Sequence, residues 1–310
     1  MNPPANNAEP AWIARFIALG AIWGSSFMFM HLAVAELGPL PTAALRVAFG
    51  ALFLLPLLVW RGQAHLLGQR WLPVFFVGLL NSGIPFALFA FSLLTLTTGL
   101  SSIINASVPM FGALVAWLWL GEKPGPWRIV GLLLGFAGVT LLAWDQAGIK
   151  GDGSGPHPLW AIAACLGACI SYAVSASFTR LHLQDVPPLV AATGSQIGAT
   201  VGMALPAAYL WPAASPSPIT WLSLVILGGL CTGVAYLLYF RLLSDCGPAR
   251  TLSVTYLIPL FAVSYGVVLL GEHFTAGMGL HAVVILLGTA MATGLIDPAA
   301  LWRNRWSAKP

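Results

Sequence analysis

The chain has 310 residues, of which 58% are hydrophobic and only 7% are charged, and its mean hydropathy is +0.87. Soluble domains carry about 25% charged residues, so this composition excludes a soluble domain and indicates a protein that crosses a membrane several times. The net charge of +4 and the pI near 9.0 would suit a nucleic-acid partner, but the distribution of the basic residues argues against one.

Ten apolar segments follow one another, each long enough to cross a hydrocarbon core of about 30 Å. The N-terminal sequence MNPPANNAEP has no basic region and no cleavage site, so the apolar run after it predicts a membrane helix instead of a removable signal peptide. The longest connection, 145–157, is rich in Gly and predicts a linker between two halves. The predicted spans are 11–34, 41–60, 71–94, 100–120, 127–144, 158–180, 188–211, 220–243, 249–270 and 275–296.

The sequence contains an internal repeat. Residues 71–122 and 221–272 are two copies of one unit, related by an offset of 150 positions without a gap. The identical pairs include Gly78 and Gly228, Pro109 and Pro259, and Glu122 and Glu272. Duplicated membrane units are typical of transporters, because repeats build cavities with two equivalent sides.

The repeat predicts an all-α membrane protein of ten transmembrane helices in two five-helix domains, residues 11–144 and 158–296. Because five is an odd number, the second repeat enters the membrane in the opposite orientation to the first. This arrangement is the inverted-repeat topology of many secondary transporters.

The basic residues indicate the orientation, because cytoplasmic loops are enriched in Lys and Arg. With the N-terminus in the cytoplasm, only Lys150 falls outside, and Arg46 lies within the second span. We therefore expect a multi-pass protein of the cell (inner or plasma) membrane, with both termini cytoplasmic and the basic residues facing lipid headgroups instead of nucleic acid. The basic residues on the inside are Arg15, Arg61, Arg70, Lys123, Arg128, Arg180, Arg241, Arg250, Arg303, Arg305 and Lys309.

Further motifs mark the first repeat: the sequence WGSSF at 23–27, Arg46 in the second span, and a Pro…Gly-Glu ending of the fourth span that recurs in the ninth. With ten spans in two repeats, the chain resembles the EamA-type members of the drug/metabolite transporter superfamily over residues 11–296. The resemblance implies a basket of ten helices around a central cavity, and export of amino acids, related metabolites or drugs. In the second repeat Tyr172 replaces the first-span Trp, and no Arg matches Arg46.

Polar and aromatic residues at mid-depth are candidates for the cavity, because polar groups are costly in hydrocarbon unless they face a cavity or a partner. Trp23 is the only tryptophan outside the predicted interfacial belts and lies roughly 16 Å into the first span. Packing between helices is the alternative role for the small polar residues. The predicted substrate-binding residues are Trp23, Ser26, Asn81, Ser82, Phe86, Asn105, Tyr172, Thr232, Tyr236 and Tyr256.

Two prolines predict kinks that act as gates or hinges. Pro109 and Pro259 lie inside the fourth and ninth spans, where each frees the carbonyl four residues earlier, at Asn105 and Thr255. Those carbonyls are also possible ligands for a substrate.

Charged residues near span ends have structural alternatives. Arg46 has three interpretations: it extends to the headgroups, it binds a substrate carboxylate, or it forms an ion pair with Glu36. Glu122 and Glu272 end the fourth and ninth spans, and we expect each to stabilise the N-terminus of the next helix.

No acidic residue is predicted at mid-depth, which argues against the buried carboxylate that proton antiport needs. The four cysteines lie in apolar stretches without metal-ligand spacing, and no nucleophile–base pair is apparent, so we expect neither an enzyme nor a metal or other cofactor.

These observations predict a secondary transporter that exports small metabolites, amino acids or amphipathic amino-acid-like compounds, by alternating access. The expected partners are the lipid bilayer and a small-molecule substrate, with the protein a monomer or a weak homo-oligomer. The alternatives are a proton-coupled multidrug exporter of the same fold and, from another class, a membrane receptor or membrane-embedded enzyme.

Overall fold

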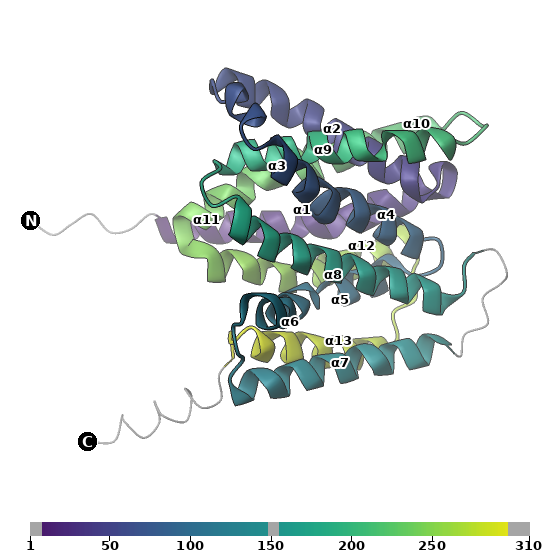
Figure 1. The fold of residues 1–310 in the computed structure, drawn as a ribbon. Coiled ribbons are helices and arrows are strands. Elements are labelled where there is room, and N and C mark those ends of the chain that lie inside the picture. The colour runs from purple at the N-terminus through teal and green to yellow at the C-terminus, as the bar shows by residue number, and fades with distance from the viewer. Residues whose placement is uncertain (1–7, 148–154, 297–310) are drawn as a thin grey trace, which may run out of the picture.

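The computed structural model describes residues 8–147 and 155–296, and all regular elements in these two ranges are helical, as the sequence predicts (Figure 1). The first half contains α1 (Ala8–Leu37), α2 (Pro39–Trp60), η1 (Ala64–Gly68), α3 (Trp71–Gly78), η2 (Leu79–Gly83), α4 (Ile84–Ser92), α5 (Thr98–Asn105), α6 (Val108–Leu120) and α7 (Pro126–Ala147). The second half contains α8 (Pro158–His182), α9 (Pro188–Tyr209), α10 (Pro218–Val225), η3 (Ile226–Val234), α11 (Ala235–Leu252), η4 (Ser253–Tyr256), α12 (Ile258–Leu270) and α13 (Ala276–Ala292). Part of the predicted linker 145–157 lies outside the described residues.

Eight helical segments are long and apolar enough to cross a membrane, which makes this a multi-pass membrane protein. The predicted number of ten spans is not confirmed by length and composition. α9 has 22 residues, but polar residues such as Thr193 and Gln196 lower its hydropathy. α13 is apolar but has only 17 residues.

The most extensive helix contacts join the two halves of the chain. α7 packs along α13 and α2 along α9, at opposite edges of the bundle in Figure 1. α1 packs against α11 and α12, and its counterpart α8 packs in the same way against α4 and α6. Each half therefore buries its apolar surface against the other, and the core is shared between the two repeats.

Glycines permit the closest of these contacts. A Cβ atom added at Gly78 would lie 2.2 Å from the carbonyl oxygen of Ser195 on α9. The equivalent Gly228 abuts Phe49 on α2 just as closely. A Cβ atom added at Gly288 would lie 2.3 Å from the backbone nitrogen of Gly135, so α7 and α13 meet backbone to backbone.

Gly271 ends α12 in the left-handed conformation, with φ of 69°, and Gly121 ends α6 in the same way with φ of 74°. The reversal lets the Glu272 amide donate to the Gly266 carbonyl oxygen, 3.0 Å away, and directs the carboxylate back along α12. A side chain at Gly266 would collide with that carboxylate, which packs over the bare backbone.

The Glu272 carboxylate caps α5 of the other repeat. It accepts hydrogen bonds from the amide and hydroxyl of Thr98, at 2.6 and 2.9 Å, and from the amide of Gly99 at 3.3 Å. The expectation that Glu272 stabilises the next helix, α13, is wrong, because the Thr275 hydroxyl already caps that helix. The expectation for Glu122 stays a prediction, and its carboxylate also pairs with Arg180 on α8.

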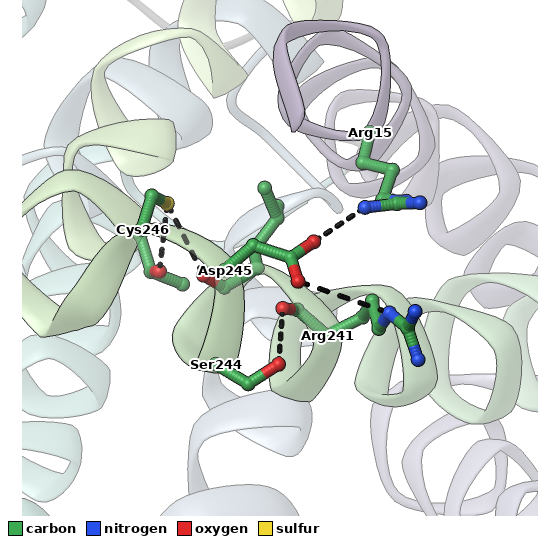
Figure 2. Close-up of polar contacts among 7 residues, drawn as sticks. Arg15, Arg241, Ser244, Asp245 and Cys246 are labelled. Atoms are coloured by element: carbon green, nitrogen blue, oxygen red, sulfur yellow. Dashed lines mark hydrogen bonds and ion pairs between the residues drawn. The ribbon is translucent and has the colours of Figure 1, made fainter. Parts of the chain in front are cut away.

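Ion pairs join the helices at the end of the bundle that is rich in arginine. Asp245 on α11 pairs with Arg15 on α1 and lies 3.8 Å from Nε of Arg241 (Figure 2). Arg70 donates to Asp185 at 2.8 Å, and this bond holds the pKa of the Asp185 carboxyl below its usual range. The Arg70–Asp185 pair is largely exposed, so water and salt screen it and we expect it to contribute little to stability.

We predict that Gly288→Ala destabilises the protein, because its Cβ atom would force α7 and α13 apart, at a cost of about 1–3 kcal/mol. Gly112 on α6 is the matched control, since an added Cβ atom there meets no neighbour. Gly112→Ala should be neutral or stabilising, because alanine favours helix by up to about 1 kcal/mol over glycine. Thermal unfolding in detergent measures both, and equal midpoints would contradict the prediction.

Candidate functional site

Two broken helices border the centre of the bundle. α5 ends at Asn105 and α6 begins at Val108, while α12 begins at Ile258 after the 3-10 turn of η4. Pro109 and Pro259 lie in the first turns of α6 and α12, where proline's missing amide costs nothing. Residues 98–120 and 250–270 each still form one apolar helical segment across the break, and the role of the two prolines as kinks, gates or hinges stays a prediction.

A cavity of about 350 Å³ lies between the helices, within the size range of small-molecule sites. Much of its lining comes in pairs of residues that are 150 positions apart, so both repeats contribute the same structural positions. Those pairs are Asn81 and Cys231, Phe86 and Tyr236, Phe89 and Tyr239, Asn105 and Thr255, and Val108 and Ile258. Asp and Glu are absent from its described lining, and Arg46 is its charged residue.

Eight of the ten residues predicted for substrate binding line this cavity; whether they bind a substrate stays a prediction. They are Trp23, Ser26, Asn81, Phe86, Asn105, Tyr172, Thr232 and Tyr236. Ser82 is fully buried behind the lining, where its hydroxyl accepts a 2.9 Å hydrogen bond from the Gln196 amide. Tyr256 lies on η4 and does not line the cavity.

Several residues that line the cavity were not predicted from the sequence. Phe89 and Tyr239 each lie three residues after a predicted lining residue, on the same helix face. Their positions in the two repeats correspond, which is the signal that would have found them. Phe27 and Met30 continue the face of α1 that carries Trp23 and Ser26, at helical spacing.

π-helical turns shape the cavity wall. η2 and η3 interrupt the third and eighth predicted spans at overlapping positions of the repeat, and they contain Asn81 and Thr232 respectively. The Thr232 hydroxyl donates to the Leu227 carbonyl oxygen, five residues earlier, at 2.9 Å. Asn81 donates from its amide to the Tyr236 hydroxyl at 3.2 Å, which joins the repeats. π-Helical turns are frequent at functional sites, because the extra residue redirects side chains.

Aromatic rings form the remaining wall. The ring of Trp23 lies 5.8 Å from that of Tyr239, and the ring of Phe89 lies 6.3 Å from that of Tyr172. Each pair joins a helix of one repeat to a helix of the other. The wall is therefore apolar on its faces and offers hydroxyl and amide groups at a few points, which suits an amphipathic small molecule.

Arg46 lies on α2, and only 5% of its surface is exposed. Its Cζ atom lies 3.7 Å from the centre of the Phe86 ring, and its Nε donates to the Thr232 hydroxyl at 3.4 Å. The interpretation that Arg46 extends to the headgroups is wrong, because the guanidinium is enclosed. The ion pair with Glu36 is also wrong, because that carboxylate accepts from the amide and hydroxyl of Ser217 at 2.6 and 2.7 Å.

Known proteins are similar to this chain in sequence or in fold. The uncharacterized transporter YvbV of Bacillus subtilis is 28% identical over 87% of both chains, and a transporter of Archaeoglobus fulgidus is 27% identical over 88% of this chain and 93% of its own. A probable terminal-alkyne amino-acid exporter of Streptantibioticus cattleyicolor is 31% identical over 49% of this chain and 51% of its own.

A solved crystal structure has the same fold, with a TM-score of 0.64 over 96% of this chain and 99% of its own, at 21% identity. The sequence profile of the EamA-like transporter family matches the chain twice, over residues 10–144 and again over residues 159–294. The chain therefore belongs to the EamA-like transporter family, within the drug/metabolite transporter superfamily.

Proposed function

We propose that this protein is a secondary transporter that exports small amphipathic metabolites, amino acids or amino-acid-like compounds, by alternating access. The observation that carries the proposal is the central cavity, lined by equivalent positions of both repeats with aromatic rings, amides and hydroxyls. One relative, similar over 49% of the chain, is named a probable terminal-alkyne amino-acid exporter, which supports this substrate class.

The proposal includes ten membrane spans in inverted repeats, with residues 11–144 and 158–296 as the two domains. α9 and α13 would supply the two spans beyond the eight recognised by length and composition. Both pack lengthwise against their counterparts in the other repeat, α2 and α7, which are recognised spans. The polar residues of α9 are buried against neighbouring helices instead of facing lipid, so its low hydropathy is compatible with a span.

Alternating access is supported by a difference between the two repeats. Leu252 lines the cavity and is 50% exposed, whereas its counterpart Ser102 is fully buried. Glu272 ties α12 to the start of α5, whereas its counterpart Glu122 pairs with Arg180. The two repeats therefore differ in their carboxylate contacts, and in the proposed two-state cycle the side held by the Glu272 cap is the closed one.

The cavity lining offers little support for the alternative function, a proton-coupled multidrug exporter. Such a protein needs a carboxylate in the cavity, and the described lining has none. His281 and Asp145, with 3.5 Å between Nδ1 and Oδ2, lie at the contact of α7 and α13, away from the cavity. Gating at the breaks before Pro109 and Pro259 remains part of the proposal, because those segments border the cavity.

The proposed setting is the cell membrane, with cytoplasmic termini. The lipid bilayer and a small-molecule substrate are the proposed partners of a monomer or weak homo-oligomer that needs no nucleic acid.

Comparing the metabolites released by cells with and without the protein tests the function. Export that persists after a pH gradient is collapsed favours facilitated export, and export that follows the gradient favours the proton-coupled alternative.

The orientation predicts which loops a membrane-impermeant thiol reagent reaches in intact cells, in a variant without native cysteines. Ser215→Cys, between α9 and α10, should react from outside, because the positive-inside rule puts that loop outside. Gln184→Cys, between α8 and α9, should react only after permeabilisation, and both side chains are exposed in the structure. The reverse pattern would show the orientation to be inverted.

Trp23→Ala should raise the half-saturating substrate concentration for export about fivefold or more, because a lost aromatic face costs about 1 kcal/mol. Trp60→Ala is the control, since the Trp60 side chain is 82% exposed and distant from the cavity lining. Rates are compared at equal amounts of folded protein. A loss of roughly 3–5 kcal/mol in stability with unchanged export kinetics would instead identify Trp23 as a packing residue.

Glu272→Gln should loosen the closed side of the cavity, because the uncharged amide caps the α5 N-terminus less well, by about 0.5–2 kcal/mol. The reporter is Ser102→Cys, at a fully buried position, labelled by a water-soluble thiol reagent in a variant without native cysteines. Glu122→Gln is the matched control, since its carboxylate forms only an exposed ion pair. Equal labelling rates in the two variants would contradict the assignment of Glu272 as a closing contact.

A further inference from the structure

Arg46 is an unusual residue for a protein interior. Among the Lys, Arg, Asp and Glu side chains whose burial the structure describes, only that of Arg46 is buried. A buried charge is costly unless a partner of opposite sign and hydrogen bonds compensate for it. No carboxylate of the described residues lies within ion-pair distance of its guanidinium. The fold therefore holds a cation in the cavity wall without a counter-charge.

The surroundings of Arg46 hold the guanidinium while leaving part of it free. The Phe86 ring covers one face of the group at 3.7 Å. The Thr232 hydroxyl, whose own proton is donated to Leu227, accepts from Nε at 3.4 Å. A guanidinium has five N–H donors, and within the described residues the four on Nη1 and Nη2 have no protein acceptor. These donors belong to a side chain that lines the cavity.

We propose that Arg46 binds a carboxylate of the transported molecule, and that the substrates are amphipathic monocarboxylates. This inference rests on the proposed export function and names its substrate class. The parallel N–H groups of a guanidinium match the two oxygens of a carboxylate, and the charge of one arginine balances one negative charge. A phosphate would call for more cations, and no second Lys or Arg lines the cavity within the described residues.

The rest of the cavity suits the remainder of such a molecule. The Phe86 ring that stacks on the guanidinium continues into the wall of Trp23, Tyr172 and Tyr236, which favours an aromatic or branched aliphatic group. Asn81 and Asn105 supply amide oxygens that accept from an α-amino group without requiring one. Amino acids therefore belong to the class, whereas cationic compounds without a carboxylate would be repelled by Arg46.

The first test compares metabolites released by cells that express the wild-type protein, Arg46→Gln, Arg46→Lys or Arg61→Gln. Arg61 is an exposed arginine after α2 and serves as the control. We expect every metabolite released through the wild type to carry a carboxylate. Arg46→Gln should reduce the release of these metabolites at least tenfold. Arg46→Lys should reduce their release less, and Arg61→Gln should not change it.

Release of compounds without a carboxylate, or undiminished release by Arg46→Gln, overturns the inference and leaves the export function intact. If the wild type releases nothing, the export function itself fails.

The second test separates binding from folding. If the charge serves a ligand and not the fold, Arg46→Gln in detergent should unfold at the same temperature as the wild type, or higher, because an uncompensated buried charge is gone. Purified wild-type protein should be stabilised by a released carboxylate compound and not by its carboxamide, and Arg46→Gln should respond to neither. A large fall in the unfolding temperature of Arg46→Gln, or equal stabilisation of the wild type by acid and amide, assigns Arg46 a structural role and overturns the inference.

Discussion

Hydrocarbon offers no hydrogen-bond partner to a backbone, so a membrane protein tolerates irregular chain only where protein or an aqueous cavity satisfies it. In this structure four irregular segments interrupt the predicted spans: the π-turns η2 and η3, and the breaks before α6 and α12. All four border the cavity. The constraint imposed by the lipid thus concentrates free carbonyls, redirected side chains and helix ends at the site proposed to take up substrate.

The repeats are bound together so closely that neither has a core of its own. α1 depends on α11 and α12, and α8 depends on α4 and α6. Glycine contacts such as Gly135 with Gly288 and carboxylate caps such as Glu272 on α5 also cross from one repeat to the other. A rearrangement of one repeat therefore necessarily repacks the other, which is the mechanical coupling that a rocking transporter requires.

Hydrophobic run length and repeat spacing predicted the helical class and part of the cavity lining, because both are local or periodic signals. Sequence reasoning failed where contacts join distant segments. It assigned Glu272 to the following helix because the capping partner, Thr98, is 174 positions away. It left an ion pair with Glu36 among three interpretations of Arg46, whereas the Glu36 carboxylate binds Ser217. The π-turns were also missed, since a single extra residue per turn leaves no mark in hydropathy.

The two π-turns also bear on the history of the chain. A π-turn adds one residue to a helix without changing the length of the span, so a copy with the turn and a copy without it would align only through a gap. The two repeats align from 71–122 onto 221–272 without one, and both carry the turn at Gly83 and Gly233. A turn already present in the duplicated unit gives this gapless alignment directly, so we infer that the bend in the cavity wall is older than the duplication that enclosed the cavity.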